Sequence, residues 1–205
     1  MANQASLLIV AAPSGTGKTS LVTSLVDLLP GIVVSVSHTT RPRRSQEQNG
    51  VHYYFVDQRA FAALIEADQF LEHARVFDHQ YGTTRAAVEA QLAQGLDVIL
   101  EIDWQGAAQA RARIPECVSI FILPPSRKVL EERLRSRAQD SDEIIARRMR
   151  AAVAEMRHYA EFDYLVINDD FERALDALKA IVLASRQRLA LQVARERERL
   201  RQLLD

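Results

Sequence analysis

The segment Ala12-Pro-Ser-Gly-Thr-Gly-Lys-Thr19 decides the fold of this chain. It follows a short apolar run at residues 7–10 that is rich in strand formers, and it precedes an amphipathic run at residues 20–29 with leucine and valine at helical spacing. Gly15 and Gly17 let the backbone bend tightly, so that successive N–H groups and the N-terminus of the helix face an anion. The order of strand, glycine-rich turn and helix therefore predicts a phosphate-binding loop.

The last two residues of this loop carry its chemistry. In a loop of this kind, Lys18 contacts the β- and γ-phosphates of a nucleotide, and the Thr19 hydroxyl ligates Mg²⁺. The common pattern begins with glycine, whereas this loop begins with Ala12, a small residue that is tolerable where φ is negative. A glycine-rich turn that merely precedes a helix is the alternative, and Gly-Lys-Thr directly after a strand argues against it.

Composition narrows the class of protein. The 205 residues suffice for one large domain, and an apolar fraction of 48% provides a sizeable core. With 26 basic and 27 acidic residues, the net charge of −1 argues against bulk electrostatic binding to nucleic acid or to an anionic membrane. Cys117 is the only cysteine, which excludes an intramolecular disulfide. Because we find neither a signal peptide nor an apolar run of about 20 residues, we expect a cytoplasmic protein.

Strands and helices alternate along most of the chain. After residues 7–10, apolar runs predict core strands at residues 97–103, 118–123 and 163–167, with helical segments between them. Ser126 is a candidate N-cap for a helix to about residue 137, and a break is expected at residues 139–141, before a helix to about residue 160. The alternation predicts an α/β fold whose right-handed crossovers build a parallel sheet. A last helix from about residue 172 is expected to close the chain.

The segment from residue 35 to residue 84 departs from this alternation. Strands follow one another there, predicted at residues 32–37, 51–56 and 70–77, with a turn at Asn49-Gly50 and a short helix at 59–67. Tyr81-Gly-Thr-Thr84 is interpreted as a turn that leads into a helix ended by Gly95. We expect a single domain in which this insertion, residues 35–84, closes over a core of residues 1–34 and 85–205, with a lid at about residues 133–150.

Charged residues follow the predicted strands where ligands bind in an open α/β sheet. Glu101 and Asp103 offer the hard oxygen ligands that Mg²⁺ prefers, although two carboxylates at a strand end are also compatible with simple solvation. The segment Arg41-Pro-Arg-Arg44 can clamp a second phosphate with hydroxyls from Tyr53 and Tyr81, although such a run is usually a solvated loop. Two phosphate-specific devices indicate one nucleotide that donates a phosphoryl group and another that accepts it.

The chain resembles the bacterial guanylate kinases over essentially its whole length. The matching pieces are Ala12–Thr19, Ser35-Val-Ser-His-Thr-Thr-Arg41, Phe70-Leu-Glu-His-Ala74, Tyr81-Gly-Thr83, Glu101-Ile-Asp-Trp-Gln-Gly106, Ile120-Phe-Ile-Leu-Pro-Pro125 and Asn168-Asp-Asp170. The resemblance implies the three-layer α/β/α fold of P-loop NTPases, with a mixed-β insertion that binds a nucleoside monophosphate and a helical lid. It also implies Mg²⁺-dependent transfer of the γ-phosphoryl group of ATP to GMP, and to dGMP, in purine nucleotide metabolism.

The resemblance further implies roles for individual residues. ATP is bound by Ala12, Pro13, Ser14, Gly15, Thr16, Gly17, Lys18 and Thr19, and by Asn168 near its base. Guanine is read by Ser37, Glu72, Thr83 and Asp103, and the GMP phosphate is held by Arg41, Arg44, Tyr53 and Tyr81. The catalytic charges are Lys18, Arg41, Arg133, Arg137 and Arg148, and Mg²⁺ is held by Thr19 and Glu101. Glu101 stands where the family often has Asp, and the position of the proline leaves open whether Arg43 or Arg44 is the second phosphate clamp.

Glu72 is the residue from which guanine specificity is expected. An ionised carboxylate accepts hydrogen bonds from both N1–H and the exocyclic amine of guanine, and adenine lacks both donors. A buried polar group that loses its partner can cost a factor of about 10⁴ in specificity. The phosphate of GMP is already an anionic nucleophile, so no general base is expected.

Two other functions stay open from the sequence. Some guanylate-kinase-like domains have lost catalysis and serve as protein-interaction modules, and a related P-loop kinase can act on a phosphorylated sugar. The intact Lys18 and Arg41 argue against the first, and Glu72 with Ser37 argues against the second. Leucine and valine residues in the tail from Arg186 are compatible with a homo-oligomer, and a solvated helical face is the simpler interpretation of its charges. We expect neither nucleic acid nor a membrane as a partner.

Overall fold

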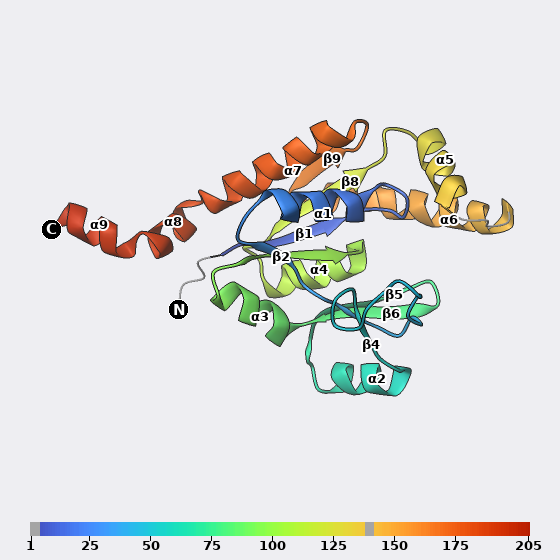
Figure 1. Ribbon diagram of the computed structural model, residues 1–205, viewed down its shortest axis with the longest axis horizontal. Coiled ribbons are helices and arrows are strands. Elements are labelled where there is room, and N and C mark those ends of the chain that lie inside the picture. Colours follow the sequence, from blue (N-terminus) through green and yellow to red (C-terminus); the bar gives the residue numbers. More distant parts are fainter. Residues whose placement is uncertain (1–4, 138–141) are drawn as a thin grey trace.

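The phosphate-binding segment leaves the middle strand of a parallel sheet. In the computed structural model, which describes residues 5–137 and 142–205 with the exception of the Arg137 side chain, this sheet has five strands. Their order is β2-β7-β1-β8-β9, and each neighbouring pair is parallel, as predicted (Figure 1). The strands are β1 (Leu7–Ala11), β2 (Ile32–Val34), β7 (Asp97–Ile102), β8 (Val118–Leu123) and β9 (Tyr164–Ile167).

Helices cover both faces of this sheet, which gives the three layers that the resemblance implies. One face packs against α1 (Lys18–Leu28) and α7 (Phe171–Arg186) in one core cluster, in which Leu25 is fully buried (Figure 1). The other face packs against α3 (Arg85–Ala93) and α4 (Trp104–Arg113) in a second cluster. Because both faces are covered, the strands between them consist of nearly continuous apolar runs.

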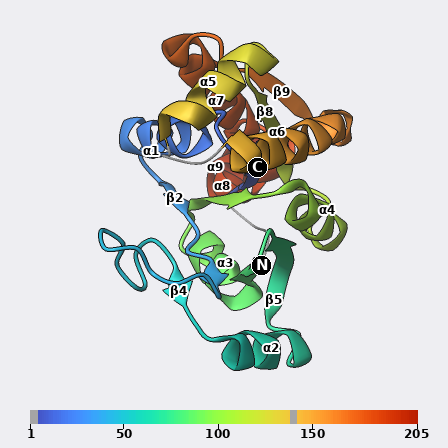
Figure 2. The same ribbon diagram turned by 90° about the vertical axis from the view of Figure 1, so that its right-hand side faces the viewer.

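A second, smaller sheet, to which β4 and β5 belong, lies beside the first (Figure 2). Its order is β4-β3-β6-β5, and it is mixed because β3 and β4 pair in parallel while the other pairs are antiparallel. Its strands are β3 (His38–Thr39), β4 (Tyr54–Phe55), β5 (Phe70–Val76) and β6 (His79–Thr84), and α2 (Gln58–Glu66) connects β4 to β5. The strands predicted at residues 32–37 and 51–56 are shorter than expected, since β2 ends at Val34 and β4 covers only residues 54–55.

The interpretation of residues 81–84 as a turn was wrong, because these residues end strand β6. The turn between β5 and β6 lies earlier, where Phe77 adopts a positive φ of 54° without help from glycine or asparagine. Gly82 has a packing role instead: a Cβ atom there would lie 2.9 Å from the Phe70 ring. A glycine that makes room for a neighbouring ring and a glycine that makes a turn look alike in a sequence.

Helix α4 holds the small sheet against the core. The side-chain amide of Gln109 donates to the carbonyl of His73 at 2.7 Å and accepts from its N–H at 3.1 Å, which satisfies the free edge of β5. Arg113 donates to the carbonyl oxygens of Phe70 and Leu71 next to it. These contacts determine where β5 places its side chains relative to the N-terminus of α4.

Two helices stand over the phosphate-binding segment at one end of the molecule. They are α5 (Arg127–Arg137) and α6 (Asp142–Met156), followed by a 3₁₀ turn, η1 (Arg157–Glu161) (Figure 1). Ser126 caps α5 as predicted, because its hydroxyl accepts the N–H of Val129 at 3.2 Å. The break expected at residues 139–141 lies outside the described part of the chain.

The last helix does not run to the end of the chain as expected. Helix α7 ends at Arg186, and α8 (Leu189–Arg195) and α9 (Arg197–Leu204) continue at a different angle, away from the body (Figure 1). Arg186 donates to the carboxylate of Asp97 at 2.6 Å and to the carbonyl of Pro30, and Arg188 donates to the carbonyl of Glu116. These contacts hold the end of α7 against the ends at which β2, β7 and β8 begin. Because the partners are far apart in the sequence, helical periodicity does not predict where α7 ends.

Candidate functional site

The glycine-rich segment has the backbone that binds an anion. Gly15 and Gly17 have φ values of 93° and 92°, a conformation that favours glycine, and α1 begins directly afterwards at Lys18. The Thr16 hydroxyl donates to the carbonyl of Pro13 at 2.9 Å, which closes the loop internally. The loop therefore presents N–H groups and a helix N-terminus to solvent at the carboxyl end of β1.

The side chains of Asn168 and Arg133 hydrogen-bond to the backbone of the phosphate-binding loop. The Asn168 amide donates to the carbonyl of Thr16 at 2.6 Å, and Arg133 donates to the same carbonyl at 3.2 Å and to the Asn168 carbonyl at 3.3 Å. Asn168 is buried, and a Cβ atom at Gly17 would lie 2.7 Å from its amide nitrogen. Gly17 is thus needed both for its φ and for this close approach. Asn168 and Arg133 were predicted as ATP and lid residues, and both contact the phosphate-binding loop itself.

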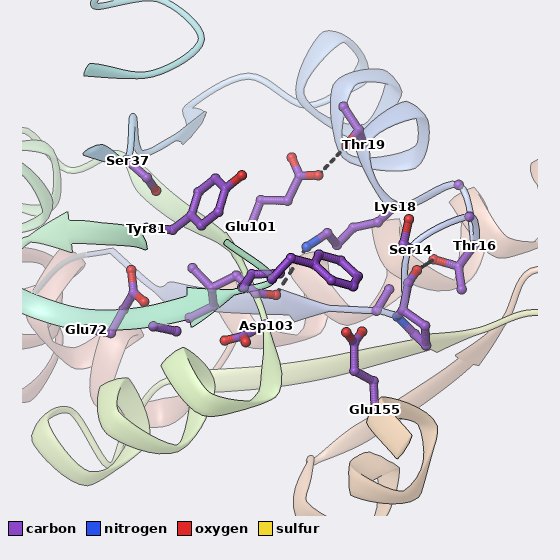
Figure 3. A pocket seen from close by; sticks show the side chains of 18 of the residues that line it. Ser14, Thr16, Lys18, Thr19, Ser37, Glu72, Tyr81, Glu101, Asp103 and Glu155 are labelled. Carbon is purple, nitrogen blue, oxygen red and sulfur yellow. Dashed lines mark hydrogen bonds between the residues drawn. The ribbon is translucent and has the colours of Figure 1, made fainter. Parts of the chain in front are cut away.

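Three side chains that can bind phosphate or a metal ion lie at the neighbouring carboxyl ends of β1 and β7: Lys18, Thr19 and Glu101. The ammonium group of Lys18 donates to the carbonyl of Ile102 at 3.1 Å, and the Thr19 hydroxyl donates to the carboxylate of Glu101 at 2.5 Å (Figure 3). A hydroxyl and a carboxylate at this spacing are the hard oxygen donors that suit Mg²⁺. The longer side chain of Glu101, compared with Asp, still reaches Thr19.

The loop and the small sheet line one cavity of about 290 Å³. Its walls come from residues 12–19, from Glu101, Ile102 and Asp103 after β7, and from the small sheet. The small sheet and its connecting loops contribute Tyr53 and, as Figure 3 shows, Ser37, Glu72 and Tyr81, all of which the sequence analysis assigned to the acceptor. The tertiary fold therefore brings together residues that are up to 143 positions apart in the sequence, from Ala12 to Glu155.

Glu72 is the buried acid of this cavity. Its side chain is 2% exposed, and its Oε1 has no hydrogen-bond partner among the described residues. The pKa of Glu72 is raised to about 7, mainly by burial and also by nearby Asp103, against the opposing effects of hydrogen bonding to Thr83 and of the charge of Lys18. A buried carboxyl group that lines a cavity with one oxygen unpartnered is suited to a ligand that supplies hydrogen-bond donors.

Three other predicted base-reading residues surround Glu72. The hydroxyl groups of Ser37 and Thr83 lie 2.9 Å apart, and Thr83 is fully buried. Asp103 caps α4, since one of its oxygens accepts the N–H of Gly106 at 2.9 Å and the other accepts from the Gln105 amide at 2.9 Å. Asp103 therefore has a local structural role in addition to its place in the cavity wall.

The predicted phosphate clamp lies at the other end of the small sheet. The guanidinium group of Arg41 lies 5.6 Å from the centre of the Tyr53 ring, and Tyr53 lies 5.9 Å from Tyr81, ring centre to ring centre. Arg41, Arg44 and Tyr81 line a second hollow, which adjoins the first at Ser14, Val76, Phe77 and Tyr81. The side chain of Arg43 instead donates to the carbonyl of Glu47 within its own loop. The geometry thus favours Arg44 over Arg43 as the second clamp.

The arginine side chains that α5 and α6 contribute to the site lie in different parts of it. Arg148 donates to the Ser14 hydroxyl at 3.0 Å and lines the second hollow, and Arg133 contacts the phosphate-binding loop from below. The side chain of Arg137 lies outside the described part of the chain. Arg147, which has no signal in the sequence beyond a charged helical face, lies with its guanidinium 5.7 Å from the centre of the Phe77 ring.

Sequence reasoning missed one further acid. Glu155, near the end of α6, lines the cavity and faces Lys18 and Asp103 (Figure 3). Its pKa is raised to about 7, mainly by burial and also by Asp103, against the opposing charges of Lys18 and His158. A single glutamate on an amphipathic helix has no local pattern, so a sequence alone does not distinguish it from a solvated residue.

Comparisons with known proteins agree with this geometry. A family model described as guanylate kinase matches residues 4–185. The guanylate kinase of Alkalilimnicola ehrlichii is 58% identical over 97% of this chain and 98% of its own, and that of Methylococcus capsulatus is 56% identical over 98% and 97%. The crystal structure of guanylate kinase from Anaplasma phagocytophilum superposes with a TM-score of 0.75 at 32% identity, over 92% of this chain and 89% of its own.

Proposed function

This chain belongs to the guanylate kinase family, and we propose that it transfers the γ-phosphoryl group of ATP to GMP, giving ADP and GDP. The observation that carries this proposal is the position of Glu72, a buried acid in the same cavity as the phosphate-binding loop. One end of the cavity offers N–H groups and Lys18 to a polyphosphate, and the other offers a carboxylate to a base. A nucleotide pair that meets between these ends can exchange a phosphoryl group.

The donor side rests on residues 12–19. The backbone N–H groups of this loop would hold the phosphates of ATP, and Lys18 would lie against the β- and γ-phosphates. Asn168 and Arg133 would act by holding the carbonyl of Thr16, which keeps the loop in its anion-binding shape. Bound Mg²⁺ would be held by Thr19 and Glu101 and would neutralise charge on the phosphates of ATP.

The acceptor side separates base recognition from phosphate recognition. Glu72, with Ser37, Thr83 and Asp103, would read the N1–H and the 2-amino group of guanine, and Arg41, Arg44, Tyr53 and Tyr81 would hold the phosphate. Glu72 must be ionised to accept both hydrogen bonds, although burial favours its neutral form before GMP binds. None of these residues is assigned to the ribose 2′-hydroxyl, so dGMP is expected to serve as well.

The chemical step then needs alignment more than covalent chemistry. The GMP phosphate attacks as an anion, and the charge that develops on the transferred group would be neutralised by Lys18, Arg41 and Arg148, with Arg133 supporting the loop. Arg137, whose side chain lies outside the described part of the chain, keeps the catalytic role that the resemblance implies. Water must be kept out, or ATP would be hydrolysed. We propose that residues 35–84 and the lid at about residues 133–150 close over the nucleotides to exclude it.

The cellular location and the partners of the enzyme complete the proposal. Among the described residues, no helix combines the length and the apolar character needed to cross a bilayer. We propose a cytoplasmic enzyme of purine nucleotide metabolism whose partners are ATP and GMP. Self-association through the projecting α8 and α9 is a further proposal, motivated by the exposure of Leu189 and Leu204.

A coupled assay with several acceptors tests the function. GMP and dGMP are expected to be phosphorylated, and AMP and ribose phosphates are expected to fail. Lys18→Ala is expected to lower kcat by about 10³-fold or more while the melting temperature stays close to that of the wild type. Phosphorylation of a ribose phosphate in preference to GMP would instead favour a sugar kinase, and GMP binding without turnover would favour a non-catalytic binding module.

A further inference from the structure

One carboxylate ties together the two arginine positions of the predicted phosphate clamp. An oxygen of Glu47 lies 2.6 Å from Nη2 of Arg41, and its other oxygen accepts the backbone N–H of Arg44 at 2.8 Å. The side chains of Arg41 and Glu47 are 13% and 15% exposed, so this ion pair is partly shielded from water. Glu47 was not singled out from the sequence, where it is one acid within a polar loop.

The same loop is closed by further hydrogen bonds. Arg41 donates through Nη1 to the carbonyl of Pro42 at 2.9 Å, and Arg43 donates to the carbonyl of Glu47 at 2.9 Å. The guanidinium of Arg41 also lies within 5.7 Å of the ring centres of Tyr53 and Phe55. Arg41 is therefore held in one orientation by its own loop.

The position of Glu47 indicates that it supports the two arginines of the clamp and does not itself contact the phosphate. Arg41 and Arg44 are among the residues that line the second hollow, and Glu47 is not. A guanidinium group has five N–H donors, and the bonds to Glu47 and Pro42 occupy two of them. Tyr81, itself a lining residue of the hollow, also interacts with Arg41, so the donors that do not face Glu47 and Pro42 lie on the side where a phosphate would bind.

We propose that Glu47 is a positioning residue for the acceptor phosphate, holding Arg41 and the backbone of Arg44 in the geometry that binds it. This inference rests on the proposed function, because it assigns the phosphate of GMP to this clamp. Hydrogen bonding to Arg41 keeps the pKa of Glu47 below its usual value, so the carboxylate is ionised at neutral pH. Without it, Arg41 would gain rotamers that binding must then restrict.

Glu47→Gln is the variant that tests this role, since it keeps the shape of the side chain and removes its charge. We expect KM for GMP to rise about tenfold, the scale of one charge-assisted hydrogen bond, while KM for ATP stays within about twofold. Guanosine, which lacks the phosphate, is expected to inhibit the variant and the wild type with similar constants. A residue with a merely structural role would shift both nucleotides and guanosine together.

Two controls separate positioning from a general effect of lost charge. Glu66→Gln removes an exposed acid from α2 in the same insertion, and it is expected to leave KM for GMP unchanged. In an Arg41→Gln background, Glu47→Gln is expected to add little further to KM for GMP, because both changes act through one guanidinium group. Melting temperatures show whether each variant is folded, and Glu47→Asp replaces Glu47→Gln if the latter is not.

The outcomes distinguish this inference from the function on which it rests. If the wild type does not phosphorylate GMP, the proposed function fails. If the wild type does so and Glu47→Gln leaves KM for GMP unchanged, lowers it, or weakens guanosine equally, the function stands and the positioning role of Glu47 is overturned. A lowered KM would mean that Glu47 competes with the phosphate instead of organising its site.

Discussion

Gly106, in the first turn of α4, leaves the space that the carboxylate of Glu72 occupies. A Cβ atom at residue 106 would overlap Oε2 of Glu72 and lie 3.2 Å from its Cδ. The bonds from Gln109 and Arg113 hold β5 against α4 and so bring the two residues together. The motif Glu101-Ile-Asp-Trp-Gln-Gly106 thus ends in glycine because a larger residue would clash with the carboxylate of Glu72.

Gly106→Ala is the first prediction from this contact. Alanine inside a helix is usually more stabilising than glycine by roughly 0.5–1 kcal/mol, so the fold should survive and the melting temperature should not fall much. The added methyl group must displace the Glu72 carboxylate, so we expect KM for GMP to rise about tenfold, the loss of about one hydrogen bond. Steady-state kinetics with each substrate in turn measure this, and an equal rise in KM for ATP would argue against it.

The raised pKa of Glu72 predicts that guanine binding releases a proton. Below a pH of about 7 the free protein holds Glu72 neutral, and a base that donates two hydrogen bonds requires the ionised form. Guanosine affinity should therefore rise from pH 5.5 to about pH 7 and level off above it. Calorimetry at pH 6.5 in buffers of different ionisation enthalpy measures the released proton; guanosine avoids the titration of the GMP phosphate, and Glu72→Gln should abolish the release.

The same pKa predicts a pH-dependent free energy of unfolding. In the unfolded chain Glu72 has the ordinary value of 4.5, so between about pH 4.5 and 7 the folded protein binds more protons than the unfolded chain. Its contribution to stability is present below pH 4.5 and is lost as the pH rises through about 7, at most about 3 kcal/mol. Urea denaturation should show a flatter pH profile for Glu72→Gln than for the wild type, and Glu155→Gln should behave similarly.

Replacement of Asn168 is predicted to weaken the binding of ATP and to leave the binding of GMP unchanged. Its amide holds the carbonyl of Thr16, so Asn168→Ala removes a buried hydrogen bond and loosens the phosphate-binding loop. We expect KM for ATP to rise about tenfold and stability to fall by about 1–3 kcal/mol, the cost of an unsatisfied buried group. Kinetics with varied ATP and denaturation curves measure both effects, and a selective change in KM for GMP would contradict the assignment.

The contact between Arg147 and Phe77 joins α6 to the tip of the β5–β6 hairpin. A cation–π contact at an exposed site is worth about 0.5–1 kcal/mol, so Arg147→Ala should lower kcat/KM for GMP about two- to fivefold if it supports closure. Arg150→Ala, an exposed arginine on the same helix, is the matched control and should have little effect. Equal losses in the two variants would indicate a general charge effect.

The sequence by itself determined the central sheet and the phosphate-binding loop. Strand β8 has the bounds predicted from the apolar run at residues 118–123, and the N-cap of α5 was identified correctly at Ser126. These features depend on patterns within a few residues: a buried strand is continuously apolar, and a cap is one residue type next to a helix start. The glycines of the loop belong to the same class, because their positive φ is a local property.

Beyond what the resemblance implied, the tertiary structure decided which distant residues meet. Strand β6 was mistaken for a turn because Gly82 makes room for Phe70, and α7 ends at Arg186 beside contacts to Asp97 and Pro30. Glu155 and Glu47 gain their surroundings from segments that no periodicity connects to them. The burial, the pKa and the ion pairs of a side chain depend on which groups lie near it in space. The folded structure sets those neighbours, and local patterns along the sequence do not show them.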